Sequence, residues 1–529
     1  MRNSQISTVI EKWSEKKIDG KRFNDIFQID GIPVWYFFEP LIKGVALPRP
    51  FKTLAEIEED VKSGKTATWF GSMKLKLISV GLRKGLLVNE KIKRFISPSE
   101  RKNADKKDVL FLGYTNEVVS DKKGRLKLIG FGDVIDTLEK KGVKHLVLFC
   151  DPLSKNSFRG LLRFPDLLYS YVDSETIKES KKLSNELNQK WKKIRKKGKL
   201  FTFNGKNYQP FLENELNFLF SREMLTILIT YYLTFKKIIE SHKIKIVFLT
   251  TLGGFYETLL LGIVYKLNKK AVYSAHGYGR KAFIVRDEFL KNVSFAAWGK
   301  EERKRLLKCG IRRENIFVLG SPFFDEIVKY KNEKTRNETK KTVALLTTAL
   351  VEYKFVEKDE YFDFIRRCLV QIGNAENVKR VIIKLHPCER YKSKYESIVK
   401  SLKLKNAEII QEVGKKILYS VMRDSDLLIS FGSTTDIEGL MLDKNIILIE
   451  GYMGDEYRKD PYKKAVIQIE KEGDLTGAIN KILGDKRAQD KLRKKRNNYI
   501  KKTFYKIDGK AHKRVVDLIV SLLNFSNDV

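Results

Sequence analysis

Three segments of the chain place a histidine or small hydroxyl residues directly after an apolar run. These residues are His276 in YSAHGYGRKAF, His386 in VIIKLHPCER, and Ser433 and Thr434 in SFGSTTDIEG. Histidine can accept or give a proton near neutral pH. Amides and hydroxyls at the start of a helix attract anions. The residue types therefore fit a site that binds phosphate and moves a proton.

The first segment places His276 before two glycines, Gly277 and Gly279, and two cations, Arg280 and Lys281. A histidine in a glycine-flanked loop beside cations suits an anionic ligand or proton transfer. The alternative is a histidine with a structural role only. We predict His276 as a catalytic residue and Arg280 as a donor-binding residue.

The second segment contains Lys384 and His386, and Pro387 follows the histidine directly. A residue before proline is held in an extended conformation, so the ring of His386 is directed instead of joining a helix. This geometry suits a hydrogen bond to a phosphate oxygen. The alternative is a strand-end histidine that donates to a backbone carbonyl. We predict that Lys384 and His386 bind the donor.

The third segment begins a helix. Ser433 is a good N-cap, and Asp436 three residues later completes a capping box. Capping explains these two residues but not Gly432, Thr434 and Thr435, which expose amides and hydroxyls where the helix dipole favours a negative group. We predict that Gly432, Ser433 and Thr434 bind a donor phosphate.

The elements that must position these segments form two series of short apolar runs separated by helical segments. Near-continuous apolar strands that alternate with helices indicate parallel sheets covered on both faces. We predict an α/β fold with two Rossmann-like domains that face a cleft, and a ligand beyond the carboxyl ends of the strands. The first series is 108–114, 144–150, 244–251, 271–275, 293–299 and 315–321, and the second is 342–348, 380–386, 407–410, 425–430, 445–450 and 465–469.

The length of 529 residues suits at least two domains, because single cores stop growing at roughly 250 to 300 residues. A polar stretch at 328–341 suits the linker between them. The predicted parts are an N-terminal helical and basic region (1–100), an N-terminal Rossmann-like acceptor domain (101–330) with a basic helical insertion (151–243), a C-terminal Rossmann-like donor domain (342–485), and C-terminal helices that pack back on the N-terminal domain (486–529).

The charge balance points to an anionic partner. The formal net charge is +38, which suits nucleic acid, an acidic membrane surface or phosphorylated substrates, although general lysine usage also contributes. Basic segments lie at 74–94, 178–199 and 486–502, and two of them carry apolar residues among the lysines. These features favour an anionic membrane surface. Nucleic acid is the lesser alternative, because no zinc finger or RNA-recognition motif is found.

The four cysteines are widely separated, which favours neither a disulfide framework nor a zinc site. The longest apolar runs are too short to cross a bilayer. We expect a cytoplasmic protein that lies at the inner face of the membrane.

The order of the motifs resembles glycosyltransferases of the GT-B type, which have two Rossmann domains. The closest likeness is to the CDP-glycerol glycerophosphotransferase and capsular-polysaccharide branch, over roughly residues 244–520. The motifs are HG at 276–277, WG at 298–299, LGSPFFD at 319–325, KLHP at 384–387, SDLLISFGSTTDIEG at 425–439 and YKIDGKAHKRVVDLI at 505–519.

The resemblance implies roles for single residues. His386, Ser433 and Thr434 would contact the donor phosphates, and His276 matches a histidine at the cleft with a catalytic role. Ala275 stands where the glycerophosphotransferase pattern usually has tryptophan, which favours a sugar donor. Glu438 would hold donor ribose or sugar hydroxyls, unless its carboxylate only stabilises the helix.

The sequence therefore predicts a metal-independent glycosyltransferase without a cofactor. It would move a sugar from a nucleotide-activated donor to a glycan or polyprenyl-phosphate-linked acceptor, with donor charge neutralised by the phosphate loops and His386. His276 is the first choice for the base, and Asp133 and Glu117 are the alternatives. The other hypotheses are a glycerophosphotransferase, a nucleotide-sugar epimerase and, remotely, a nucleic-acid-binding protein.

Overall fold

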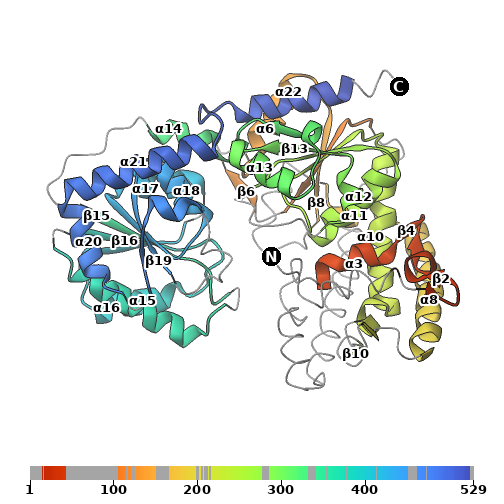
Figure 1. Cartoon of the computed structure of the whole chain (residues 1–529), viewed down its shortest axis with the longest axis horizontal. Coiled ribbons are helices and arrows are strands. Elements are labelled where there is room, and N and C mark those ends of the chain that lie inside the picture. The colour runs from red at the N-terminus through yellow and green to blue at the C-terminus, as the bar shows by residue number, and fades with distance from the viewer. Residues whose placement is uncertain are drawn as a thin grey trace.

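Two six-stranded parallel sheets organise the chain, one in each half (Figure 1). The structure is a computed structural model, and it describes residues 15, 17–42, 105–114, 117–120, 126–150, 166–197, 202–203, 206–207, 213, 216–276, 285–331, 341–352, 355–376, 378–412, 414–450, 461–471 and 473–524.

The first sheet has the strand order β14-β13-β12-β11-β5-β8, and all neighbouring strands are parallel. Every residue of β5, β11 and β13 is buried, as the near-continuous apolar runs require of strands covered on both faces. The strands are β5 (Val109–Gly113), β8 (His145–Phe149), β11 (Ile246–Leu249), β12 (Lys270–Tyr273), β13 (Val293–Ala297) and β14 (Ile316–Val318). Among the helices around this sheet are α6 (Gly132–Lys140), α10 (Arg222–Ser241), α11 (Phe255–Lys266), α12 (Asp287–Leu290) and α13 (Lys300–Lys308).

The second sheet has the order β17-β16-β15-β18-β19-β20, again with parallel neighbours. This is the doubly wound Rossmann order, and the predicted α/β fold with two Rossmann-like domains is confirmed. The strands are β15 (Lys341–Leu346), β16 (Val378–Lys384), β17 (Ala407–Ile410), β18 (Leu427–Ser430), β19 (Asn445–Ile449) and β20 (Ile467–Ile469). Its helices are α15 (Lys358–Gly373), α16 (Lys392–Ser401), α17 (Lys415–Asp424), α18 (Thr434–Met441) and α20 (Leu475–Gly484).

Each sheet reverses its strand order at one point. The reversal lies between β5 and β11 in the first sheet and between β15 and β18 in the second. Ligands of open α/β sheets bind at such reversals, beyond the carboxyl ends of the strands. The loops that follow these four strands are therefore the first place to look for a site.

Helix α8 (Ser174–Ile194) contains most of the basic segment predicted at 178–199. It packs along α10 and buries Leu187, Trp191 and Ile194, while its lysines lie on the other side. The Asp173 side chain accepts a hydrogen bond from the amide of Thr176 and caps the helix. The basic segment at 74–94 lies outside the described residues.

The smaller elements precede the first sheet, connect strands within a sheet, or lie between the two sheets. Residues 332–340 of the predicted linker are outside the described residues. The small elements are β1 (Lys17–Ile18), β2 (Lys21–Arg22), α2 (Phe23–Ile26), β3 (Gln28–Ile29), β4 (Ile32–Pro33), α3 (Val34–Ile42), β6 (Val118–Ser120), β7 (Leu126–Leu128), η2 (Leu168–Tyr171), η3 (Arg195–Lys197), β9 (Thr202–Phe203), β10 (Lys206–Asn207), η4 (Arg313–Asn315), η5 (Pro322–Ile327), α14 (Val328–Lys331) and η6 (Pro461–Ala465).

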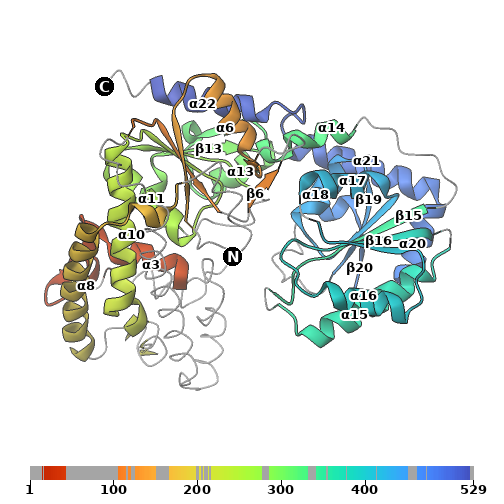
Figure 2. The same ribbon diagram turned by 180° about the vertical axis from the view of Figure 1, so that it is seen from behind.

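The chain returns to the first domain at its C-terminal end. Helix α21 (Lys486–Thr503) packs against α20 of the second domain and α13 of the first, and α22 (Ala511–Asn524) lies along α6 (Figures 1 and 2). Asp325, before α14, accepts hydrogen bonds from the amides of Ala511 (3.0 Å) and His512 (2.7 Å) and so caps α22. Within the described residues, no helix is long and apolar enough to cross a bilayer.

Candidate active site

Two of the predicted phosphate-binding segments follow the strands on either side of β15, and the Ser433 segment follows β18 at the strand reversal of the second sheet. Leu346 of β15 is level with Lys384 of β16 on one side and with Ser430 of β18 on the other. His386 and Ser433 follow two and three residues later, beyond the carboxyl ends of strands that flank β15. With neighbouring strands spaced about 4.8 Å apart, these two residues lie on the order of 10 Å from each other. That span fits a diphosphate.

The His386 loop is held in place by a buried carboxylate. Glu389 is only 4% exposed and accepts hydrogen bonds from the His386 amide (2.6 Å) and from the hydroxyls of Thr347 and Tyr395. Burial raises the pKa of Glu389. Thr347 directly follows β15, so Glu389 ties the loops after β15 and β16 together. Glu389 and Thr347 were not among the predicted site residues, although Glu389 follows the predicted strand 380–386 and Thr347 lies near the end of the predicted strand 342–348.

The protonation of His386 is set by its surroundings. Its Nδ1 accepts a hydrogen bond from the Cys388 amide (3.2 Å), so the proton of the neutral ring is on Nε2. Burial, and then the charge of Lys384, lowers the pKa of His386 to about 4. At neutral pH the ring therefore acts as an Nε2–H donor, and it brings no charge to a phosphate.

Lys384 is almost fully buried at the end of β16. Its ammonium donates to the carbonyl of Leu385 (2.7 Å), and burial lowers its pKa. The structure thus places this lysine within the base of the loop. Its contact with a donor stays a prediction.

The start of α18 contains a complete capping box. The Ser433 amide donates to Asp436 (3.1 Å), and the Thr435 amide donates to the Ser433 hydroxyl (3.4 Å). Gly432 has φ +90°, a conformation that other residues rarely adopt, which explains the glycine without a ligand. The cap does not engage the amide and hydroxyl of Thr434, which lie at the positive end of the helix dipole.

Glu438 lies inside the second domain and is 3% exposed. It accepts a hydrogen bond from the Tyr419 hydroxyl (2.8 Å), and Lys415 Nζ lies 3.8 Å away. Burial raises the pKa of Glu438 and lowers that of Lys415 to about 8. The carboxylate therefore links α18 to α17, and a contact with donor hydroxyls stays a prediction.

On the first sheet, His276 is exposed just beyond β12. Its amide donates to the carbonyl of Thr250 (3.1 Å), and its ring Nδ1 lies 3.1 Å from the same oxygen. A carbonyl only accepts, so Nδ1 carries the hydrogen and Nε2 of the neutral ring has a lone pair. The tautomer is opposite to that of His386 and suits a base. Trp298 Nε1 donates a hydrogen bond to the carbonyl of Ala275, the residue before His276 (3.2 Å).

Three other residues of the first domain were predicted for the site, and none has a described contact with His276. Arg280 lies outside the described residues. Glu117 accepts a hydrogen bond from the Tyr114 amide (3.3 Å) in the turn after β5. Asp133, in the first turn of α6, forms an ion pair with Lys127 (2.7 Å).

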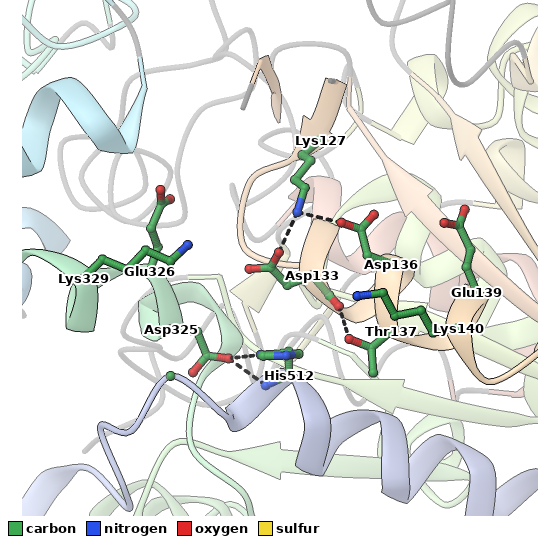
Figure 3. A pocket seen from close by; sticks show the side chains of 11 residues that line it. Lys127, Asp133, Asp136, Thr137, Glu139, Lys140, Asp325, Glu326, Lys329 and His512 are labelled. Carbon is green, nitrogen blue, oxygen red and sulfur yellow. Dashed lines mark hydrogen bonds and ion pairs between the residues drawn. The ribbon is translucent and has the colours of Figure 1, made fainter. Parts of the chain in front are cut away.

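Asp133 also lines a pocket of about 580 Å³ between α6, the chain before α14 and the start of α22 (Figure 3). Asp325 and His512 lie at its lower side, joined by a 2.8 Å contact. The lining includes neither of the two site histidines nor Ser433. The pocket therefore does not unite Asp133 with the phosphate loops.

The carboxyl edges of the two sheets approach each other at Phe323. A Cβ on Gly130, in the loop before α6, would lie 2.6 Å from the Phe323 ring. On the other side, Lys415 at the start of α17 donates to the Phe323 carbonyl and lies 3.2 Å from the ring centre. The loops that carry His276 and His386 thus belong to sheet edges that meet.

Comparison with known proteins gives one family and several distant structures. Residues 292–520 match the family model of UDP-N-acetylglucosamine 2-epimerase. No curated protein sequence matches the chain. A putative UDP-N-acetylglucosamine 2-epimerase from Listeria monocytogenes is 12% identical, with a TM-score of 0.46, and the match covers 79% of this chain and 96% of that one.

Two transferases are comparably distant. MurG from Acinetobacter baumannii is 9% identical with a TM-score of 0.45, over 78% of this chain and 99% of its own. The wall teichoic acid polymerase TagF is 12% identical with a TM-score of 0.44, over 87% of this chain and 99% of its own. Likeness at this level gives no argument about activity.

The family match supports an enzyme, and it spans the whole second sheet. It covers less than half of the chain and begins beyond His276. It does not single out the glycerophosphotransferase branch that the motifs resemble.

Proposed function

We propose that the protein is a glycosyltransferase that takes a sugar from a nucleotide-activated donor. The observation that carries this proposal is the pair of opposite histidine tautomers at two sheet edges that meet. His386 is an Nε2–H donor beside the start of α18, and His276 offers an Nε2 lone pair from the other domain. Transfer of a sugar from phosphate to a hydroxyl benefits from a hydrogen-bond donor at the leaving phosphate and a base at the hydroxyl, and the two tautomers supply these roles.

In the proposed reaction, the donor diphosphate binds between the loops after β16 and β18. His386 Nε2–H, the Ser433 hydroxyl, the Thr434 amide and hydroxyl and the dipole of α18 stabilise the leaving phosphate. His276 removes the proton from an acceptor hydroxyl, whose oxygen forms a bond to the anomeric carbon as the bond to phosphate breaks. The proposed reaction uses these fixed dipoles and no metal.

The proposed acceptor is a glycan, free or linked to polyprenyl phosphate, at an anionic membrane surface. The exposed lysines of α8 and α21 support this, since polybasic helices bind anionic lipid. Flotation with vesicles of anionic lipid tests it. We expect binding at low salt and release at high salt, and no binding at low salt would contradict a membrane role.

A nucleotide-sugar epimerase is the second candidate, because the family match names that activity. An epimerase would convert its nucleotide sugar without an acceptor. A glycerophosphotransferase is the third, on the motif resemblance alone. The three candidates share the phosphate loops and differ in product.

Product analysis separates the candidates. UDP-, GDP-, CMP- and CDP-linked donors are incubated with and without a mixed glycan acceptor, and products are followed by NMR. We expect nucleotide release that requires the acceptor and that is lost in His276→Gln. The control is His145→Gln, at the amino end of β8. A changed sugar without acceptor would establish the epimerase instead.

A further inference from the structure

A buried carboxylate lies at the strand reversal of the first sheet. Glu257 is in the first turn of α11 and is 2% exposed. Its Oε1 accepts hydrogen bonds from the Tyr114 hydroxyl (2.8 Å) and from the Thr251 hydroxyl. Tyr114 follows β5 and Thr251 follows β11. One carboxylate oxygen thus joins the two loops on either side of the reversal.

The two oxygens of Glu257 differ in their surroundings. Oε2 is buried and has no hydrogen-bond partner among the described residues. A Cβ on Gly254, the residue before α11, would lie only 2.0 Å from this oxygen. The glycine therefore makes room for the carboxylate to fold back over the start of the helix. A polar group that is buried with half its acceptors unused is costly, and so calls for an explanation.

The hydrogen bond between Glu257 and Thr251 lies one residue along the chain from a partner of His276. Thr251, which Glu257 holds, is bonded along the chain to Thr250. The carbonyl of Thr250 receives both the amide and the ring Nδ1 of His276. The position of this one carbonyl fixes the orientation of the imidazole and places its proton on Nδ1. A shift of the backbone at Thr250 and Thr251 would displace this carbonyl and with it both His276 bonds.

We propose that Glu257, with Thr251 and Tyr114, is a positioning latch that fixes the Thr250 carbonyl and thereby keeps His276 in its Nδ1–H tautomer. Glu257 does not touch substrate, because its carboxylate is buried. Its importance for turnover rests on the proposed function, in which His276 Nε2 is the base. Its effect on the tautomer does not depend on any substrate.

A role in positioning His276 predicts a different pattern of variant effects from a purely structural role. Glutamine at position 257 keeps an oxygen at the Oε1 site and places its NH₂ at the site of the unpartnered Oε2. Glu257→Gln should therefore preserve the latch, whereas Glu257→Leu removes the acceptor. Gly254→Ala leaves the chemistry intact but displaces the carboxylate. Thr251→Val removes one of the two donors.

The first test is the tautomer of His276 in the full chain. The protein has five histidines, so ¹⁵N-histidine labelling gives a short spectrum, and His276→Gln assigns the signal. We expect an Nδ1–H ring in the parent and in Glu257→Gln. In Glu257→Leu, Gly254→Ala and Thr251→Val we expect a mixture of tautomers, with His386 unchanged as Nε2–H.

Thr234→Val is the matched control, since the hydroxyl of this buried threonine donates to the Thr230 carbonyl of its own helix, its one bond to a described residue. Variants are compared at equal helix content by circular dichroism. If Glu257→Leu does not fold, Gly254→Ala and Thr251→Val decide the matter. An unchanged His276 signal in both of these would overturn the latch.

The second test is kinetic. Loss of the latch should lower kcat about tenfold or more with donor KM within about twofold, because misplacing a catalytic group acts on the chemical step. Glu257→Gln should stay near the parent. If His276→Gln retains full activity, the proposed function fails while the tautomer result still stands. If the tautomer changes without an effect on kcat, the latch exists but does not serve catalysis.

Discussion

Replacement of Glu389 should loosen the His386 loop. Both carboxylate oxygens are in use: one takes the His386 amide and the Thr347 hydroxyl, and the other takes the hydroxyls of Tyr395 and Tyr361. In Glu389→Gln the NH₂ group faces either the His386 amide, which only donates, or the two tyrosine hydroxyls, which would then have to turn and accept. Glu257 differs, because its second oxygen has no described partner. The change from glutamate to glutamine is therefore expected to be disruptive at position 389 and tolerated at position 257.

The magnitude follows from the lost hydrogen bonds. Bonds to a charged acceptor contribute about 1.5–3 kcal/mol each, against about 0.5–1.5 kcal/mol for neutral ones. Two of the shortest bonds become neutral or are lost, which costs about 2–3 kcal/mol, and relief of the carboxylate's desolvation offsets part of it. We expect a net destabilisation of about 2 kcal/mol.

The assays are urea unfolding and donor affinity. We expect a lower unfolding midpoint and donor binding weaker by about tenfold, equivalent to about 1.4 kcal/mol. Glu408→Gln is the matched control, because this exposed glutamate on β17 forms a surface ion pair with Arg380. If Glu389→Gln behaved like Glu408→Gln in both assays, the hydrogen bonds to Glu389 would have no role in stability or donor binding.

Three further predictions concern the same framework. Gly432→Ala, at φ +90°, should cost about 1–2 kcal/mol in unfolding free energy and weaken donor binding measured by calorimetry; an unaltered affinity would contradict the loop's role. The folded pKa of His386, about 4, lies below its unfolded value of about 6.5, so its contribution to stability is present above pH 6.5 and is lost as pH falls towards 4. Between pH 6.5 and pH 4, the urea midpoint of unfolding should therefore fall less in His386→Asn than in the parent. Asp325→Ala removes the cap of α22 and should cost about 1 kcal/mol, with faster amide exchange at the start of α22; equal exchange would refute the cap.

The strands and their parallel arrangement could be predicted from the sequence because burial on both faces leaves an unbroken apolar run. β17 has the bounds that its run predicts, and β18 lies within its run. The positions of the loops that carry His386 and Ser433 could be predicted as well, because a residue that follows such a run lies at the carboxyl edge; phosphate binding by these loops stays a prediction. The capping box at Ser433 and Asp436 is a local pattern, and the structure contains it.

The packing behind the loops could not be predicted, because it depends on residues that are distant in sequence. Glu438 meets Tyr419 and Lys415 of another helix. Glu257 meets Tyr114, which lies 143 residues away. Neither spacing leaves a periodic signal in the sequence. The tautomers of the histidines likewise depend on tertiary neighbours.

The most direct test of the central claim is a thermal-shift titration with nucleotide-linked sugars, on the parent, His386→Ala, Ser433→Ala and the His145→Gln control. A donor at about a hundred times its Kd stabilises the folded protein by about 2.7 kcal/mol. We expect at least one donor to raise the melting temperature of the parent and of His145→Gln, and we expect the shift to be reduced or absent in His386→Ala and Ser433→Ala. An equal shift in all four proteins would place the donor elsewhere and contradict the account.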